Sequence, residues 1–237
     1  MQDPIITVSG LRGVVGTSLT PEIAIRYACA FAGELPAGAI LISRDSRPSG
    51  RMLADAIRSG LNAMGRDVID AGIAATPTTG VLVQQLEAVG AIQISASHNP
   101  PPYNGMKLFS AEGRVLPAAA GQRVMQRYES VLTDWVDHTQ LGEAIACSDS
   151  TSEHLRRVLA TVDVEAIRSR RYRVLLDANH GAGSLLGQPL LEALGCETTV
   201  LGAQPDGRFA HVPEPTAENL AGVLSRVSNQ GVDVGFC

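Results

Sequence analysis

A short polar segment between residues 95 and 107 holds the side chains with the clearest chemistry in this chain. It reads Ser-Ala-Ser-His-Asn, continues through three prolines and reaches Lys107, the only lysine in a sequence with 19 Lys plus Arg. A serine hydroxyl can accept a phosphoryl group, and a lysine amine, unlike an arginine guanidinium, can release a proton. The prolines stiffen the loop that carries the serine. We therefore expect Ser97 and Lys107 to share one reactive site; an exposed lysine without a role is the alternative for Lys107.

The neighbouring His98 raises the question of a hydrolase-type serine. The Gly-x-Ser-x-Gly elbow is missing, and adjacent residues of an extended segment point to opposite sides, so His98 is badly placed to activate Ser97. A serine that receives a phosphoryl group needs positive charge and a metal ion around the transferred group instead.

Two further segments carry charged side chains at the predicted ends of strands. They are residues 10–13 (Gly-Leu-Arg-Gly) and residues 44–47 (Arg-Asp-Ser-Arg). Ligands of open parallel sheets bind at the carboxyl ends of strands, so we expect both loops and the segment 95–107 to converge on one cleft. Arginines and a lysine around serines favour a dianionic, phosphorylated ligand. The alternative for the second loop is that its arginines only pair with Asp45 and nearby acids.

Hydrophobic periodicity predicts parallel βαβ units. The order strand, helix, strand, helix, strand is expected between residues 38 and 95, preceded by a helix that begins at Thr20 and Pro21. A turn and a helix are expected over residues 110–132, and a polar stretch runs from residue 134 to about residue 150.

We expect two domains, residues 1–150 and residues 151–237. The order strand, aspartate, small-residue loop, helix and strand occurs around Asp45 and again around Asp177. We interpret this as two copies of an α/β domain, and the alternative is the general similarity of any two βαβ units.

Composition indicates a globular protein without a polyanionic partner. The chain has a net charge of −5 and 45% hydrophobic residues, and the basic run at residues 168–173 is interpreted as a solvated helix end. We therefore expect no nucleic-acid partner. Without a membrane-length apolar run or a signal peptide, we expect no membrane contact and a cytoplasmic location. The four separated cysteines predict buried free thiols.

The segment ISASHNPPPYNGMK resembles the phosphoserine loop of the α-D-phosphohexomutases, the phosphoglucomutase, phosphomannomutase and phosphoglucosamine mutase family. Three more segments resemble that family in the same order along the chain, namely SGLRGVVG, SRDSRPSG and LLDANHGAG. The resemblance implies the N-terminal part of an isomerase that interconverts hexose 1-phosphate and 6-phosphate. The reaction is implied to pass through a phosphoserine and a hexose 1,6-bisphosphate.

The resemblance also implies roles for individual residues. Ser97 matches the phosphoserine, Lys107 and His98 match residues of acid–base chemistry and hydrogen bonding, and Arg12 matches a residue near the phosphoserine. The residues implied to bind phosphate or to support the loop around it are Arg44, Asp45, Arg47 and Asn99.

The resemblance breaks at the end of the second domain. In the family, Mg²⁺ lies between the serine phosphate and three aspartates of a D-x-D-x-D-R loop, and this sequence stops at Cys237, where that loop is expected. The implied fold class is therefore α/β, with two tandem three-layer domains, mainly parallel sheets and a truncated second domain. In this chain the implied metal ligand is Ser97, through its phosphate. Hard cations need several oxygen ligands, so we expect the chain alone to be inactive or nearly so.

Other interpretations stay open on the sequence alone. Gly181-x-Gly183-x-x-x-Gly187 after a strand is close to a dinucleotide-binding pattern, but the next strand lacks the acid expected for ribose. The chain could also be a naturally short, phosphosugar-binding remnant without catalysis. A cut chain would expose apolar surface and could associate with itself. Asp177 and Asn179 are implied to be structural or to lie at the cleft.

Overall fold

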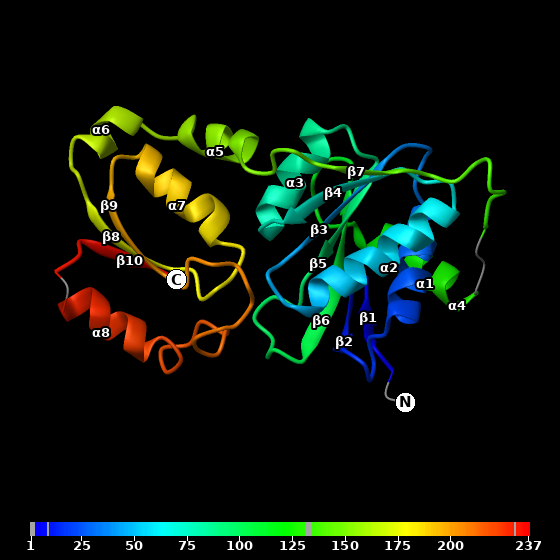
Figure 1. Ribbon diagram of the computed structural model, residues 1–237, viewed down its shortest axis with the longest axis horizontal. Helices are drawn as coiled ribbons and strands as arrows, with labels where there is room; N and C mark the ends of the chain where they lie inside the picture. Colours follow the sequence, from blue (N-terminus) through cyan, green and yellow to red (C-terminus); the bar gives the residue numbers. More distant parts are fainter. Residues whose placement is uncertain (1–2, 9, 131–133, 230) are drawn as a thin grey trace. The chain divides into compact units, whose positions relative to one another are not determined.

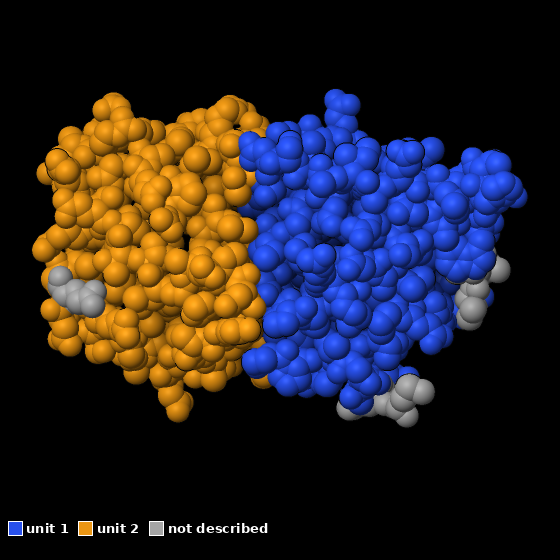
Figure 2. Space-filling view, in the orientation of Figure 1, with its two compact units in different colours: residues 1–97, 101–150 blue, residues 98–100, 151–237 orange. Residues whose placement is uncertain are grey.

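The computed structural model of this protein describes residues 3–8, 10–130, 134–229 and 231–237. Its contacts divide the chain into two compact units (Figure 2). The first consists of residues 1–97 and 101–150, and the second of residues 98–100 and 151–237.

The first unit is built on a seven-stranded mixed sheet with the order β1-β2-β6-β5-β3-β4-β7. Its parallel pairs join β3 (Ile40–Arg44), β4 (Val68–Ile73), β5 (Gly90–Ile94) and β7 (Ala144–Ala146). Its antiparallel pairs join β1 (Ile5–Thr7), β2 (Gly10–Val14) and β6 (Tyr103–Ser110), and β6 also pairs with β5. The carboxyl end of β5 therefore lies between a parallel and an antiparallel neighbour.

Helices cover both faces of this sheet (Figure 1). One face carries α1 (Pro21–Ala32), α2 (Ser49–Ala63) and α4 (Ala118–Glu129), and the other carries α3 (Thr76–Gln85). Helix α1 begins as predicted, because the Thr20 hydroxyl accepts a hydrogen bond of 3.3 Å from the Ile23 N–H and Pro21 occupies the first turn. The first unit is thus a three-layer α/β structure.

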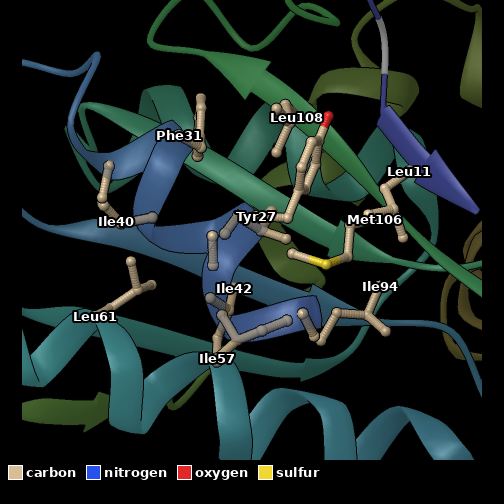
Figure 3. Packing of buried hydrophobic residues seen from close by; sticks show 14 of the residues in the cluster. Leu11, Tyr27, Phe31, Ile40, Ile42, Ile57, Leu61, Ile94, Met106 and Leu108 are labelled. Carbon is tan, nitrogen blue, oxygen red and sulfur yellow. The ribbon is translucent and has the colours of Figure 1, made fainter. Parts of the chain in front are cut away.

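The larger core lies between the sheet and the face that carries α1 and α2. Figure 3 shows Tyr27 and Phe31 of α1 packed among side chains of β3, α2 and β6. The labelled members are Leu11, Tyr27, Phe31, Ile40, Ile42, Ile57, Leu61, Ile94, Met106 and Leu108. This core fixes β2, β5 and β6, the strands that carry or immediately precede Arg12, Ser97 and Lys107.

Two segments predicted as loops are strands. Residues 10–13 lie in β2, and Lys107 lies inside β6, where the two strands pair with each other. The sequence did not predict this pairing, because both segments contain glycine, a residue typical of turns. A Cβ on Gly105 would lie 2.5 Å from the Leu11 carbonyl oxygen, so glycine is required where β6 approaches β2.

Three smaller expectations are also corrected or limited by the structure. The polar stretch after residue 134 contains strand β7. The helix expected within residues 110–132 is α4, and positions 131–132 lie outside the described residues. All four cysteines, each within the described residues, are free as expected, but Cys29 is the buried one and Cys237 is exposed.

The second unit has a three-stranded parallel sheet with the order β10-β8-β9. Its strands are β8 (Arg173–Asp177), β9 (Glu197–Leu201) and β10 (Val234–Phe236), and its helices are α5 (Ser152–Leu159), α6 (Val164–Arg168), α7 (Ser184–Ala193) and α8 (Ala221–Asn229). Figure 1 shows α7 and α8 on opposite sides of this sheet.

The two units repeat the same pattern. The sequence of elements β8-α7-β9-α8-β10 corresponds to β3-α2-β4-α3-β5, and the strand order β10-β8-β9 corresponds to β5-β3-β4. This is the arrangement expected for two copies of one α/β domain. None of the helices among the described residues is both long and apolar enough to cross a membrane.

Candidate active site

A pocket of about 280 Å³ in the first unit brings together three of the residues singled out in the sequence. Its polar lining consists of Thr7, Arg12, Ser95, Ser97 and Lys107. Among the described residues that line it, two are cationic and none is acidic. The pocket therefore favours an anionic ligand beside a serine hydroxyl.

Strand register explains why Arg12 and Lys107 lie together. Across the β2–β6 pair, Arg12 is opposite Gly105 and Gly10 is opposite Lys107. Residues two apart on a strand share a face of the sheet, so the two cations project from the same face. Gln93 of β5 is opposite Lys107 on the other side and shares that face.

Ser97 follows the carboxyl end of β5 in a turn with an unusual backbone conformation. Its φ is 56°, in the left-handed region that residues other than glycine rarely adopt. Strain of this kind costs ~1–3 kcal/mol and clusters at functional sites. The Ser97 N–H donates to Ser95 Oγ at 3.0 Å, and Ser97 itself is exposed. Ser95 was not among the predicted site residues, although the Ser-x-Ser spacing is the sequence signal for this turn.

Arg47 does not line the pocket and is buried beneath the serine loop. It is 2% exposed. Its Nη2 donates to the Ser97 carbonyl oxygen at 3.0 Å, its Nη1 to the Tyr103 carbonyl oxygen at 3.1 Å, and its Nε to Asp45 Oδ2 at 3.2 Å. Burial lowers the pKa of Arg47, with Asp45 acting in the opposite direction, and an arginine stays charged at neutral pH.

The other residues implied for the site lie outside the lining of this pocket. Arg44 ends β3 and lies over Gly50 of α2, where a Cβ would be 3.3 Å from Arg44 Cδ. His98 is exposed and Asn99 is half-buried. The described lining of the pocket does not include Arg44, Asp45, His98 or Asn99.

Comparisons with known proteins match this chain along both units. The model of the phosphoglucomutase/phosphomannomutase α/β/α domain I matches residues 4–134, and the model of domain II of the same family matches residues 152–237. The chain belongs to the phosphoglucomutase/phosphomannomutase family.

Individual relatives agree with this family membership. A phosphoglucomutase/phosphomannomutase of Thermococcus kodakarensis is 39% identical over 232 residues, which are 95% of this chain and 51% of the relative. A probable phosphoglucosamine mutase of Methanopyrus kandleri is 34% identical and covers 96% of this chain. The chain spans about half the length of the curated relatives it matches.

Solved structures of the family show the same fold. A phosphoglucomutase/phosphomannomutase family protein of Burkholderia thailandensis has a TM-score of 0.81 and 28% identity, with 98% of this chain and 53% of that chain covered. The Thermus thermophilus protein described as a putative phosphomannomutase superposes with a TM-score of 0.83 at 24% identity, which supports the fold alone.

In this chain, a buried hydrogen-bond network supports β5, the strand that pairs with β6 at Lys107. The hydroxyl groups of Ser43 and Thr79 each donate a hydrogen bond to Gln93 Oε1, and their two oxygens lie 2.8 Å apart. Gln93 Nε2 donates to the Ala74 carbonyl oxygen at 3.1 Å. The network links β3, β5 and α3. It therefore fixes the position of Gln93, the residue of β5 that is opposite Lys107 of β6.

A second polar cluster lies at the carboxyl end of β8 in the second family domain. His211 Nε2 is 2.7 Å from Asp177 Oδ2, and Asp177 is 7% exposed. Asn179 Oδ1 accepts from the Ala210 N–H at 2.8 Å, and Asn179 Nδ2 donates to the His211 carbonyl oxygen at 3.1 Å. Asp177 and Asn179 thus hold the loop after β9 to the sheet. His211 was missed, because no motif in the sequence marks it.

The described residues do not fit the Mg²⁺ ion that the family resemblance implies. No group of three or more His, Cys, Asp or Glu among them could hold a metal ion. Asp45, the acid beneath the serine loop, is paired with Arg47. Mg²⁺ requires several oxygen ligands, and Ser97 would supply a ligand only when it carries a phosphate.

Proposed function

We propose that this chain is the N-terminal part of a phosphohexomutase, an isomerase in which Ser97 carries a phosphoryl group between the 1- and 6-positions of a hexose. The observation that carries the proposal is the joint position of Ser97, Arg12 and Lys107 in one cationic pocket. Family membership and the names of the relatives support it.

The chemistry has two phosphoryl transfers through Ser97. In the first, the bond between Ser97 Oγ and phosphorus breaks as a sugar hydroxyl forms a bond to phosphorus and loses its proton, which gives a hexose 1,6-bisphosphate. In the second, Ser97 Oγ takes the other phosphoryl group of that bisphosphate, and the sugar oxygen regains a proton. In this proposal Arg12 and Lys107 neutralise charge on the transferred group, and Lys107 exchanges the proton with the sugar hydroxyl.

A fusion enzyme tests this proposal. The chain is joined to the C-terminal half of the Thermococcus kodakarensis relative, and conversion of glucose 1-phosphate and mannose 1-phosphate to the 6-phosphates is measured with added Mg²⁺ and hexose 1,6-bisphosphate. We expect turnover that is lost in Ser97→Ala and retained in the matched variant Ser130→Ala. A folded fusion without turnover contradicts the proposal.

The isolated chain is expected to lack mutase turnover, because it spans about half of the relatives that carry the name of mutase. Turnover by the purified 237-residue chain contradicts this expectation. The second candidate, a phosphosugar-binding remnant, is supported by the cationic pocket itself. Calorimetric titration with hexose phosphates distinguishes it, since a remnant binds them and the fusion shows no Ser97-dependent turnover.

The remaining parts of the proposal concern location and partners. A cytoplasmic location is supported by the free state of the four described cysteines, since thiols stay reduced there. Phosphosugars are the proposed ligands, and neither nucleic acid nor membrane is a proposed partner. Self-association is proposed for the second unit, where an apolar groove of about 310 Å³ lies beside β10.

A further inference from the structure

We infer that Arg47 is a positioning residue that fixes the orientation of Ser97 in the pocket. The inference about loop geometry stands on the structure, and its consequence for catalysis rests on the proposed function. The feature that carries it is a buried guanidinium whose donors hold the two ends of the segment from Ser97 to Tyr103.

The guanidinium joins two carbonyl groups that lie six residues apart in the chain. Nη2 binds the Ser97 carbonyl oxygen at 3.0 Å and Nη1 binds the Tyr103 carbonyl oxygen at 3.1 Å. The planar fork of an arginine sets the spacing of its donors, so the two carbonyls are held at a defined separation. The loop with the three prolines is therefore closed at its base by one side chain.

Asp45 fixes the guanidinium in turn. Its Oδ2 accepts from Arg47 Nε at 3.2 Å, and its Oδ1 accepts from the Arg47 backbone N–H at 2.9 Å. The Arg47 side chain is 1% exposed and that of Asp45 is 17% exposed, so water competes little for these bonds. Asp45 thus determines where the fork points, and the fork determines the separation of the Ser97 and Tyr103 carbonyls.

The position of Ser97 shows why this matters for the pocket. Its N–H is bound to Ser95 Oγ at 3.0 Å, and its carbonyl is bound to Arg47. Both peptide groups that flank the Ser97 Cα are therefore tethered, although its φ of 56° is an unfavourable value. Two tethers hold the Cα–Cβ direction, and with it the hydroxyl, toward the pocket that it lines.

The alternative is that Arg47 binds the phosphate of a ligand directly. Against this, Arg47 is 2% exposed and is absent from the described lining of the pocket, whereas Arg12 is present in it. The two roles predict different behaviour, because a phosphate-binding arginine contributes to ligand affinity and a positioning arginine contributes to the rate of transfer.

The first test is amide hydrogen exchange on the 237-residue chain. Arg47→Gln and Arg47→Lys are compared with Arg58→Gln, a matched change at an arginine that pairs with Asp55 and Asp70 away from the loop. We expect at least tenfold faster exchange in the segment 96–104 for Arg47→Gln, with no change in the amides of β3. Lysine keeps the charge but lacks the rigid, planar fork that sets the separation of the two carbonyls, so Arg47→Lys should restore protection from exchange only in part.

Exchange in this segment that is the same in Arg47→Gln and wild type overturns the inference. If Arg47→Gln does not fold, Arg47→Lys is measured in its place, because it retains a cation beside Asp45. Exchange in the segment 96–104 that is as slow in Arg47→Lys as in wild type then overturns the inference.

The second test uses the fusion enzyme with the T. kodakarensis half. A misplaced reacting group costs up to about a hundredfold in rate, so Arg47→Gln should lower kcat by roughly ten- to a hundredfold with KM nearly unchanged. A raised KM with unchanged kcat shows a phosphate-binding role and contradicts positioning. If the wild-type fusion has no turnover, the proposed function fails, and hydrogen exchange alone decides the role of Arg47.

Discussion

The two cations of the pocket differ in what their side chains can do. Arg12 carries a permanently charged, planar guanidinium, which suits the binding of phosphate oxygens at two points. Lys107 carries a compact ammonium that can give up a proton, so it can serve a step in which a sugar hydroxyl is deprotonated or reprotonated. Because both side chains lie on one face of the β2–β6 pair and line one pocket, we expect a single anionic group bound there to contact both.

Replacing Lys107 with arginine separates charge from proton transfer. The cation stays in the pocket, but its proton cannot leave, and general acid–base catalysis contributes about 10²–10⁴-fold. We expect Lys107→Arg in the fusion enzyme to lower kcat by about a hundredfold or more with a small change in KM. Steady-state kinetics over a range of pH provides the measurement, with Arg114→Lys as a control in the same unit. Turnover equal to wild type would show that Lys107 has no role in proton transfer.

His211 is expected to be charged in the folded chain. Nε2 lies 2.7 Å from a carboxylate oxygen of Asp177 and Nδ1 lies 2.9 Å from the Val212 carbonyl oxygen. Neither oxygen can donate, so both bonds exist only when both ring nitrogens carry a proton. Burial alone lowers the pKa of His211, but the bonds to Asp177 and Val212 and the charge of Asp177 outweigh it and raise the pKa. A separate pocket of about 450 Å³ in the second unit is lined by Asp177 and His211 together with Arg226 of α8.

The sign of the pH effect follows from this raised pKa. The unfolded chain has a histidine pKa of about 6.5, so the stabilisation is fully present below that pH and is lost as the pH rises through the higher pKa of the folded state. We expect His211→Gln to lower the Tm most at pH 5.5 to 6 and least at pH 9. Thermal unfolding across this range measures it, with His138→Gln as an exposed control. A Tm difference independent of pH contradicts the charged state.

At the scale of strands, the site depends on the close contact of β2 with β6. Gly105 is opposite Arg12 in this pair, and a Cβ there would lie 2.5 Å from the Leu11 carbonyl oxygen and 3.0 Å from that of Ser95. A larger residue must therefore push β6 away from β2 and from the end of β5. The distance between Arg12 and Lys107 and the turn at Ser97 then change together.

An alanine at Gly105 should destabilise the first unit. Overpacking of a tightly packed site costs typically ~1–3 kcal/mol, so the Tm of Gly105→Ala should fall by several degrees. Gly222→Ala is the matched control, because a Cβ at Gly222 in α8 meets no atom within 4 Å and alanine favours helices. Calorimetry should show a lower Tm for the first variant and an unchanged or higher Tm for the second. Equal Tm values for Gly105→Ala and wild type contradict the close-contact argument.

The sequence predicted the local elements of the first unit, but it did not predict the contacts between distant segments. Local patterns predicted α1 with its Thr20 cap and the βαβαβ order of the first unit, since periodicity and capping are properties of neighbouring residues. The β2–β6 pair was missed, because it joins segments about ninety residues apart that look like turns. The resemblance singled out Ser97, Arg12 and Lys107, but the contact of Arg47 with the Ser97 carbonyl depends on tertiary structure and has no sequence signal.

At the scale of the whole chain, the two units share one pattern of strands and helices but differ in the pairing of β5 and the corresponding strand β10. In the first unit, β5 pairs with β3 on one side and with β6 on the other. In the second, the corresponding β10 pairs with β8 on one side, and no strand among the described residues pairs with its other edge. An unpaired strand edge is a template for another chain.

The apolar groove beside β10 should therefore support association of a second copy at high concentration. Phe236 and Val234 of β10 line it together with Tyr172, and their exposed fractions are 50%, 37% and 41%. A charge placed there should prevent strand pairing and burial of the groove, so we expect sedimentation velocity to show a concentration-dependent dimer in wild type and a monomer in Phe236→Lys. Leu224→Lys is the control, since Leu224 is 51% exposed on α8 and does not line the groove. A wild-type chain that stays monomeric across the concentration range, or a dimer that both variants weaken equally, places the association elsewhere or excludes it.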